Sequence, residues 1–289
     1  MLIVRAYAKI NLTLDILGKR EDGYHDIASV IQTIDVSDKL SFGSSSDIHL
    51  ECNTSAIEIK DNLVFRAIEI LKRYSGSQEG VWVYLEKNIP MSSGLGGGSS
   101  DAACTLMALN HLWDLKLKIS ELKVFAADLG ADVPFFLEGG TALVNGKGED
   151  VSPLPDIEDV YFVLLVPESY VNNKTATMYG NISPNDYTDG EMSRRLTRFI
   201  ENNGKLHNAL LGNAFENVAD EVFPNIDTYR QAMVASGASS VCLTGAGPTI
   251  YAVTESLNRA SLIESRLMEM GYFPTIAKAV PRGGFNVLG

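Results

Sequence analysis

The feature that most constrains this chain is a segment rich in glycine and serine, residues 90–104, with the sequence PMSSGLGGGSSDAAC. Apolar side chains recur after it at helical spacing, which predicts a helix that begins near Ser99 or Ser100. The first N–H groups of a helix have no partner within the helix, and the helix dipole is positive at this end. The segment is therefore either an anion site at a helix N-terminus or a flexible loop before an ordinary helix.

The surroundings of this segment favour the anion site. Residues 81–85 (VWVYL) predict a strand directly before it, so residues 90–100, here called the glycine loop, connect a strand to a helix. The chain contains no G-x-x-x-x-G-K-[ST] motif, no strand-linked G-x-G-x-x-G motif and no G-x-S-x-G elbow. These absences argue against a Walker-type site, a dinucleotide site and an acyl hydrolase. The glycine loop can cradle phosphates, but it carries no basic side chain of its own.

Two segments near the N-terminus supply polar groups that could complete such a site. Residues 6–16 alternate apolar and polar side chains, which predicts a strand with one buried face. Lys9 and Asn11 share its polar face, which is either solvated, the commoner case, or lines a cleft. Tyr24 and His25 follow Gly23 in a polar turn. Their rings could stack on and hydrogen-bond a planar base, although most such pairs are ordinary turn residues.

Asp132 lies in residues 130–136 (GADVPFF), where its neighbours are almost all apolar. A carboxylate in such surroundings needs partners, because removing a charge from water costs free energy. One interpretation is an N-cap on a short helical turn that begins near Pro134. The other is a general base in a largely dry pocket. The two interpretations are compatible. Together with a phosphate cradle and a strand lysine, a general base would suit phosphoryl transfer.

Residues 152–159 (SPLPDIED) mark a change of composition in the 289-residue chain and predict a boundary between a domain of residues 1–156 and a domain of residues 157–289. The order β, α, β, β, α, β with an insertion after the boundary predicts a ferredoxin-like α+β domain. The predicted elements there are a strand over 160–166, a loop over 167–177, helices near 189–203, 208–220 and 225–237, strands over 239–243 and 249–253, a helix over 257–271 and a strand over 274–280. Those before the boundary include a strand pair over 27–42 with a turn near Ser37 and Asp38, a helix capped by Asp61 or Asn62, and a helix from Ser120 to Gly130.

Composition limits the partners and the compartment. The net charge of −12 argues against a nucleic-acid or anionic-membrane surface, since both need clustered Lys and Arg, but it allows a small phosphorylated substrate. Three widely spaced cysteines form no metal or disulfide pattern, so we expect reduced thiols in a cytoplasmic protein. The start of the chain has no signal-peptide pattern, and the longest apolar run, 160–166, is too short to cross a bilayer. No obligate protein partner is evident.

The motifs together resemble a known family. The glycine loop resembles the phosphate-binding motif of the GHMP kinase superfamily, and residues 243–249 (LTGAGPT) resemble its third motif. Residues 8–12 (AKINL), 22–25 (DGYH) and 130–136 narrow the resemblance to those members that act on a cytidine diphosphate-linked methylerythritol. The resemblance covers nearly the whole chain. The glycine loop alone would indicate only the superfamily, whereas the motifs in this order are specific.

The resemblance implies a fold, an activity and two cofactors. The implied fold is a two-domain α+β GHMP kinase fold with an N-terminal ribosomal-protein-like nucleotide-binding domain and a C-terminal ferredoxin-like domain. The implied activity is the ATP-dependent phosphorylation of the 2-hydroxyl of the cytidyl substrate, with Mg²⁺. The alternatives are another GHMP small-molecule kinase, of the mevalonate or homoserine type, and a non-catalytic metabolite-binding relative. The sequence around Tyr24 and His25 favours the cytidyl substrate.

The resemblance also implies roles for individual residues. Asp132 would take the proton from the substrate hydroxyl, and Lys9 would stabilise charge between that carboxylate and the phosphate. The ligands of the metal stay open, apart from a serine hydroxyl of the glycine loop. The implied ATP contacts are Asn62, Leu63, Pro90, Met91, Ser92, Ser93, Gly94, Leu95, Gly96, Gly97, Gly98, Ser99 and Ser100. The implied substrate contacts are Asn11, Tyr24, His25, Thr175, Gly245, Ala246 and Gly247.

Three positions depart from the family pattern. Ser92 stands where glycine is usual, Ala246 where many members have serine, and Ala214 where aspartate is usual. None of the three removes a catalytic group. The sequence does not determine how these three residues affect the geometry of the phosphate site or the contact between the domains.

Overall fold

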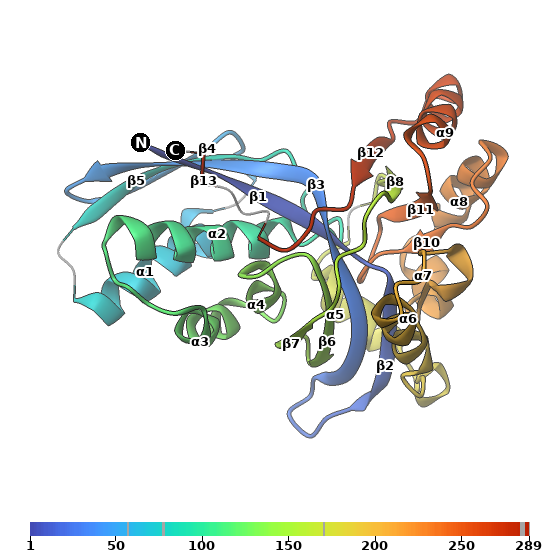
Figure 1. Ribbon diagram of the computed structural model, residues 1–289, viewed down its shortest axis with the longest axis horizontal. Coiled ribbons are helices and arrows are strands. Elements are labelled where there is room, and N and C mark those ends of the chain that lie inside the picture. Colours follow the sequence, from blue (N-terminus) through green and yellow to red (C-terminus); the bar gives the residue numbers. More distant parts are fainter. Residues whose placement is uncertain (57, 77–78, 170, 284–286, 289) are drawn as a thin grey trace.

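The computed structural model describes residues 1–289 except 57, 77–78, 170, 284–286 and 289. Two β-sheets organise the described part of the chain, and Figure 1 shows them in different parts of the molecule, linked by the long strand β3 and its neighbours. The larger sheet contains β1 (Leu2–Asn11), β2 (Thr13–Lys19), β3 (His25–Ser45), β4 (Ile48–Cys52), β5 (Gly80–Glu86), β6 (Thr141–Gly146), β7 (Asp150–Pro153), β9 (Gly212–Asn213) and β13 (Val287–Leu288).

Four helices pack together against the larger sheet, below β1, β3 and β5 in the view of Figure 1. They are α1 (Leu63–Ser75), α2 (Gly97–Leu112), α3 (Ile119–Leu129) and α4 (Val133–Phe136), and a short 3₁₀ turn, Ile59–Asp61, precedes them. α1 forms as predicted: the Asn62 side chain accepts a hydrogen bond from the backbone N–H of Val64 at 2.9 Å, which satisfies one free donor of the first turn. Its apolar stripe is buried against α2 and α3.

The smaller sheet has the ferredoxin-like arrangement that the sequence predicts. Its strands are β8 (Tyr161–Leu165), β10 (Cys242–Leu243), β11 (Ile250–Thr254) and β12 (Thr275–Lys278), and they pair antiparallel in the order β10, β11, β8, β12. The helices of this half are α5 (Lys174–Asn181), α6 (Glu191–Glu201), α7 (Glu216–Val222), α8 (Ile226–Ala235) and α9 (Leu257–Glu269), with 3₁₀ turns at Pro184–Asp186 and Asn208–Leu210. Among the described helices, none is long and apolar enough to span a membrane.

The two halves share buried contacts. One apolar cluster contains Ile10 and Val30 from the larger sheet together with Phe162, Leu196 and Tyr251 from the other half. Strand β9 also pairs parallel with β2, which attaches a segment of the C-terminal half to the N-terminal sheet. The predicted boundary between residues 156 and 157 stays a prediction.

The predicted strand pair over 27–42 is wrong. β3 continues through Ser37 and Asp38 without a turn and pairs with β1, and the register shifts where Tyr7 faces Ser37 and Ala8 faces Ile34, so the extra residues lie on β3. Asp38 is fully buried, and its carboxylate accepts hydrogen bonds from the backbone N–H groups that follow β5. Polar residues that resemble a turn in the sequence are therefore an internal anchor, and their partners lie some fifty residues further along the chain.

Other boundaries also differ from the predictions. Residues 6–16 are not one strand but the end of β1 and the start of β2, and residues 208–220 contain a 3₁₀ turn, β9 and part of α7 in place of one helix. Helix α2 begins at Gly97, before the predicted start at Ser99 or Ser100. Helix α3 begins at Ile119 with Lys118 as its N-cap, so Ser120 is not the cap. Helix α5 begins inside the segment 167–177 that was predicted to be a loop. Short helices with few buried apolar residues give a weak periodic signal, and α5 buries only Met178.

Candidate active site

A cleft of about 1530 Å³ collects most of the predicted site residues from both halves of the molecule. Three of them, Leu95, Ser100 and Gly247, are buried and do not line it. The predicted residues that line it are Lys9, Asn11, Tyr24, His25, Asn62, Leu63, Pro90, Met91, Ser92, Ser93, Gly94, Gly96, Gly97, Gly98, Ser99, Asp132, Thr175, Gly245 and Ala246.

Lys9 and Asp132 meet in this cleft. The Lys9 side chain is only 5% exposed, and its Nζ lies 3.6 Å from Asp132 Oδ2 and donates to Asn11 Oδ1 at 2.6 Å. Asp132 precedes α4, but its carboxylate makes no capping hydrogen bond in the described structure. The side chain is 38% exposed, so Asp132 faces the open cleft and not the dry pocket that its apolar neighbours predict. A carboxylate in this position is free to contact a bound hydroxyl.

The polar face of β1 is buried at its end, at Lys9 and Asn11, and the contacts of Asn11 show why. Its backbone N–H donates to Thr244 Oγ1 at 2.9 Å, and its carbonyl accepts from the Tyr251 hydroxyl at 2.9 Å. The side-chain amide donates to Ser29 Oγ at 2.8 Å, which turns Asn11 Oδ1 toward Lys9. The C-terminal half therefore covers the face that a solvated strand would expose, and Lys9 has a fixed acceptor on that face.

The glycine loop packs closely between residues 243–249, the third motif, and Lys9. Gly94 has φ +91°, and a Cβ there would lie 2.6 Å from the carbonyl oxygen of Thr244 and 2.9 Å from that of Gly247. Gly96 has φ +73°, and its Cβ would meet the Phe136 ring at 2.8 Å. Only glycine combines this backbone conformation with such close approach. The N-terminus of α2 opens into the cleft directly after these residues, so its free N–H groups and positive dipole end suit a phosphate.

Aromatic rings line another part of the cleft. His25 is 8% exposed and stacks on Tyr179 of α5, with ring centroids 4.8 Å apart, and Tyr179 in turn meets the edge of Phe215. Burial, with a smaller contribution from the Lys19 charge, lowers the pKa of His25, which keeps the ring neutral at pH 7. Tyr24 is 57% exposed, which leaves its ring open to a ligand.

Sequence reasoning missed several residues of this region. Tyr179 and Phe215 line the cleft, but no motif marks them, because they lie in short elements without strong periodicity. The sequence reasoning gave Lys147 no role, yet its Nζ lies 4.9 Å from the centroid of the Tyr24 ring. Lys174 lay in the predicted loop and was given no role, although it lines the cleft.

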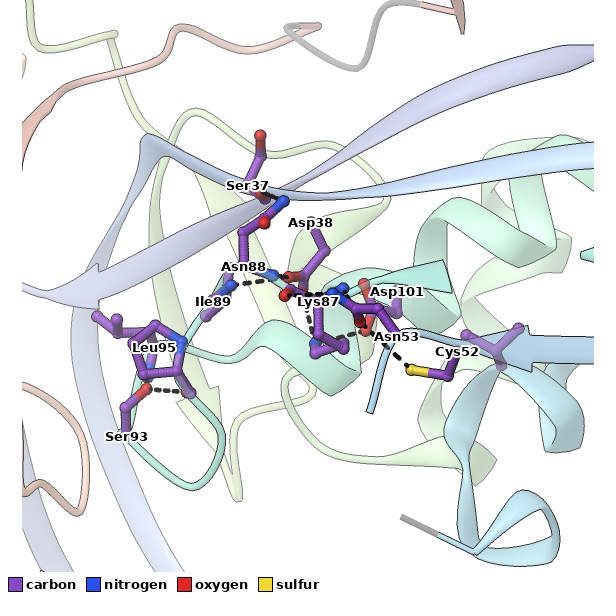
Figure 2. A network of polar contacts seen from close by, with 12 residues as sticks. Ser37, Asp38, Cys52, Asn53, Lys87, Asn88, Ile89, Ser93, Leu95 and Asp101 are labelled. Carbon is purple, nitrogen blue, oxygen red and sulfur yellow. Dashed lines mark hydrogen bonds and ion pairs between the residues drawn. The ribbon is translucent and has the colours of Figure 1, made fainter. Parts of the chain in front are cut away.

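A buried ionic network lies beside the glycine loop, near the start of α2 (Figure 2). Lys87 Nζ contacts the carboxylate of Asp38 and donates to Asp101 Oδ2 at 2.8 Å. The side chains of Lys87, Asp38 and Asp101 are 7%, 0% and 3% exposed. Burial raises the pKa of Asp101 to about 8, against the opposing charge of Lys87. The network ties the first turns of α2 to β3, and a Cβ on Gly97 would lie 3.1 Å from Lys87 Nζ.

Comparisons with known proteins agree with this geometry. Residues 62–140 match the model of the GHMP kinases N terminal domain, and residues 193–272 match that of the GHMP kinases C terminal domain. The homoserine kinase of Cytophaga hutchinsonii superposes with a TM-score of 0.74 at 19% identity over 99% of this chain and 97% of that one. At this identity the likeness concerns the fold alone, and it supports the two-domain α+β architecture.

Closer relatives narrow the family. A 4-diphosphocytidyl-2-C-methyl-D-erythritol kinase of Dehalococcoides mccartyi is 41% identical over 94% of this chain and 96% of its own length. An enzyme of the same name from Thermoanaerobacter pseudethanolicus is 35% identical over 97% of this chain and 96% of its own. A crystal structure of a 4-(cytidine 5'-diphospho)-2C-methyl-D-erythritol kinase superposes with a TM-score of 0.80 at 30% identity, covering 96% of this chain and 98% of that chain. The chain belongs to the 4-diphosphocytidyl-2-C-methyl-D-erythritol kinase family of the GHMP kinases.

Proposed function

We propose that this chain transfers the γ-phosphoryl group of ATP to the 2-hydroxyl of 4-diphosphocytidyl-2-C-methyl-D-erythritol, a step of the non-mevalonate route to isoprenoid precursors. One observation carries the proposal. The Lys9–Asp132 pair, with its 3.6 Å separation, lies in the same cleft as a glycine loop that can hold phosphates and as a cluster of aromatic rings that can hold a nucleobase. A kinase for a cytidine diphosphate-linked alcohol needs these three parts together.

The cytosine would bind among the rings of Tyr24, His25 and Tyr179. Stacking on an aromatic face is favourable for any nucleobase, and the neutral imidazole of His25 offers one donor and one acceptor for the polar edge of the base. Lys147 lies beside Tyr24 and lines the cleft, so it could meet the diphosphate of the substrate. Thr175 also lines the cleft, and we infer a contact with the substrate there.

Asp132 would act as the general base. The substrate hydroxyl gives its proton to an oxygen of the Asp132 carboxylate as the hydroxyl oxygen forms a bond to the γ-phosphorus. The bond between that phosphorus and the oxygen that bridges to the β-phosphorus breaks, and ADP leaves with the electron pair of that bond. The proton therefore ends on Asp132 and the phosphoryl group on the substrate. The exposure of Asp132 lets solvent remove the proton afterwards.

Lys9 would supply positive charge at the reacting centre. Its ammonium group contacts Asn11 and Asp132, and one of its three donors is left for a phosphoryl oxygen. Because Asn11 is fixed by three further hydrogen bonds, Lys9 needs little rearrangement when the substrates bind.

The residues present fit a magnesium ion held mainly by ATP. Among the described residues no group of three or more histidine, cysteine, aspartate or glutamate side chains forms a metal site. Mg²⁺ in nucleotide sites often takes only one or two protein oxygen ligands beside phosphates and waters. The Ser99 hydroxyl lines the cleft at the start of α2 and would be such a ligand. The metal would neutralise phosphate charge when it is bound.

The test is a substrate panel with one variant, Lys9→Met. Purified protein is incubated with ATP and Mg²⁺ and with the cytidyl substrate, mevalonate or homoserine, and ADP and the phosphorylated product are both measured. We expect turnover with the cytidyl substrate alone, a loss of several orders of magnitude in Lys9→Met, and retained binding of CDP in that variant. Turnover with mevalonate or homoserine would identify another GHMP kinase activity. Binding of CDP without any turnover would indicate a non-catalytic relative.

A further inference from the structure

Lys174 is a cation of the cleft that the mechanism above does not use. It is the first residue of α5, so it comes from the C-terminal half, and its side chain lines the same cleft as Lys9 and Asp132. Its Nζ donates to the carbonyl oxygen of Gly247, the last glycine of the third motif. An ammonium group has three donors, so two remain for a ligand.

The charge of Lys174 is not matched by a carboxylate. Among the described residues no acidic group lies within ion-pair distance of its Nζ, whereas Lys9 already pairs with Asp132. Two lysines and one aspartate leave this part of the cleft with an excess of positive charge. A half-buried cation without a counter-ion is unfavourable in the free protein, which suggests that an anion completes the arrangement when the ligands bind.

The titration of Lys174 agrees with this geometry. Burial, and then the charge of Lys9, lowers the pKa of Lys174 to about 7, while Asp132 opposes the shift. On its own helix the other titratable ring is Tyr179. Helix α7 packs against α5 and begins with Glu216, but that carboxylate is bound by Arg230. Apart from the more distant charge of Asp132, the described residues place no carboxylate in contact with the Lys174 ammonium, and an incoming phosphate would supply that anion.

We propose that Lys174 is a second catalytic cation, which contacts the phosphoryl group while it passes from ATP to the substrate hydroxyl. The inference rests on the proposed kinase function and adds a residue to it. The Gly247 carbonyl that Lys174 Nζ contacts lies two residues after Gly245, where a Cβ would be 3.2 Å from Lys9 Nζ, so Lys174 is next to the reacting centre. Tyr179, which belongs to the proposed cytosine site, lies five residues after Lys174 on α5, about 7.5 Å away along the helix axis. Helix α5 therefore contributes Lys174 to the reacting centre and Tyr179 to the nucleobase site.

The anion that Lys174 contacts could be the phosphoryl group of ATP in transfer or the diphosphate of the cytidyl substrate. Steady-state kinetics distinguish these two cases. In Lys174→Met, loss of a cation that contacts the group in transfer should lower kcat by roughly 10²-fold, with the KM values for ATP and for the cytidyl substrate little changed. Lys205→Met, an exposed lysine outside the cleft, is the matched control and should retain wild-type kinetics. A wild-type kcat in Lys174→Met would overturn the proposal. A rise in the KM of the cytidyl substrate alone would also overturn it, because the lysine would then bind the substrate diphosphate.

The pH profile separates a catalytic cation from a lysine that only holds the carbonyl of Gly247. In the wild type, kcat/KM should fall as the pH rises through about 7, because the free enzyme loses the charge on Lys174. In Lys174→Arg the guanidinium stays protonated, so the fall should move to higher pH while more activity remains than in Lys174→Met. An unchanged alkaline limb in Lys174→Arg would refute the proposal, since a structural role would not move it. If the wild type does not turn over the cytidyl substrate, the proposed function itself fails.

Discussion

Replacing Lys87 with methionine tests how the glycine loop is held. The ammonium group of Lys87 is the cation between two buried carboxylates, and its removal leaves Asp38 and Asp101 facing each other without a positive charge. Asp38 keeps two backbone donors, the N–H groups of Asn88 and Ile89, at 2.6 Å and 2.8 Å. The substitution therefore removes a hydrogen-bond partner mainly from Asp101.

The expected decrease in the free energy of unfolding follows from this difference between Asp38 and Asp101. Removing one partner of a buried ion pair typically costs about 3–5 kcal/mol, because a charge remains in a dry environment. Part of this cost is avoided because burial raises the pKa of Asp101 to about 8, so Asp101 is already largely protonated at pH 7, and the loss of Lys87 would raise its pKa further. We therefore expect Lys87→Met to lower the free energy of unfolding at pH 7 by about 3 kcal/mol, at the lower end of that range.

The assay is urea denaturation followed by tryptophan fluorescence. Both tryptophans of the chain, Trp82 on β5 and Trp113 directly after α2, lie in the half of the molecule that contains the network. The control is Lys39→Met, which removes an exposed ion pair with Glu86 at 3.9 Å and should cost less than about 1 kcal/mol. The double variant Lys87→Met/Asp101→Asn should recover part of the stability. Equal losses in Lys87→Met and Lys39→Met would refute the reasoning.

Three further predictions concern the loop and the aromatic rings. Gly94→Ala should lower the melting temperature and impair turnover, because its Cβ would lie 2.6 Å from the carbonyl oxygen of Thr244; an unchanged melting curve would contradict this. Ser92→Gly should stabilise the fold by roughly 0.5–1 kcal/mol in urea denaturation, because Ser92 has φ +52°, a strained conformation for any residue with a Cβ. His25→Ala should weaken CDP binding in calorimetry by about tenfold, because the ring stacked on Tyr179 is lost; equal affinity would remove His25 from the site.

Much of the fold was readable from local patterns. The cap at Asn62, the apolar stripe of α1 and the β, α, β, β, α, β order of the C-terminal half follow from periodicity and capping chemistry, and the structure confirms them. The error in β3 has a clear cause. Ser37 and Asp38 resemble a turn because they are polar, but Asp38 is buried by partners some fifty residues away. Hydrophobic periodicity contains no information about such partners.

The candidate site also contains residues that the sequence predicts and residues that it does not. Lys9, Asn11 and Asp132 were proposed from local sequence and from the family resemblance, and the structure brings their side chains together. The alternation over residues 6–16 nevertheless predicts one buried face, whereas Lys9 and Asn11 on the other face are buried as well, and the C-terminal half contacts Asn11. Lys174 and Tyr179 were not found, because they lie in a helix of eight residues that has few buried positions. Their importance arises from tertiary packing alone.

The most direct test of the account is the rate of phosphoryl transfer in Asp132→Asn, which keeps the shape of the side chain and removes its basic oxygen. Rapid-quench measurement of a single turnover with ATP, Mg²⁺ and the cytidyl substrate reports the chemical step. Loss of a general base predicts a decrease of about 10²–10⁴-fold, with unchanged CDP affinity and an unchanged melting temperature. Transfer at close to the wild-type rate would contradict the account, because Asp132 would then not accept the proton.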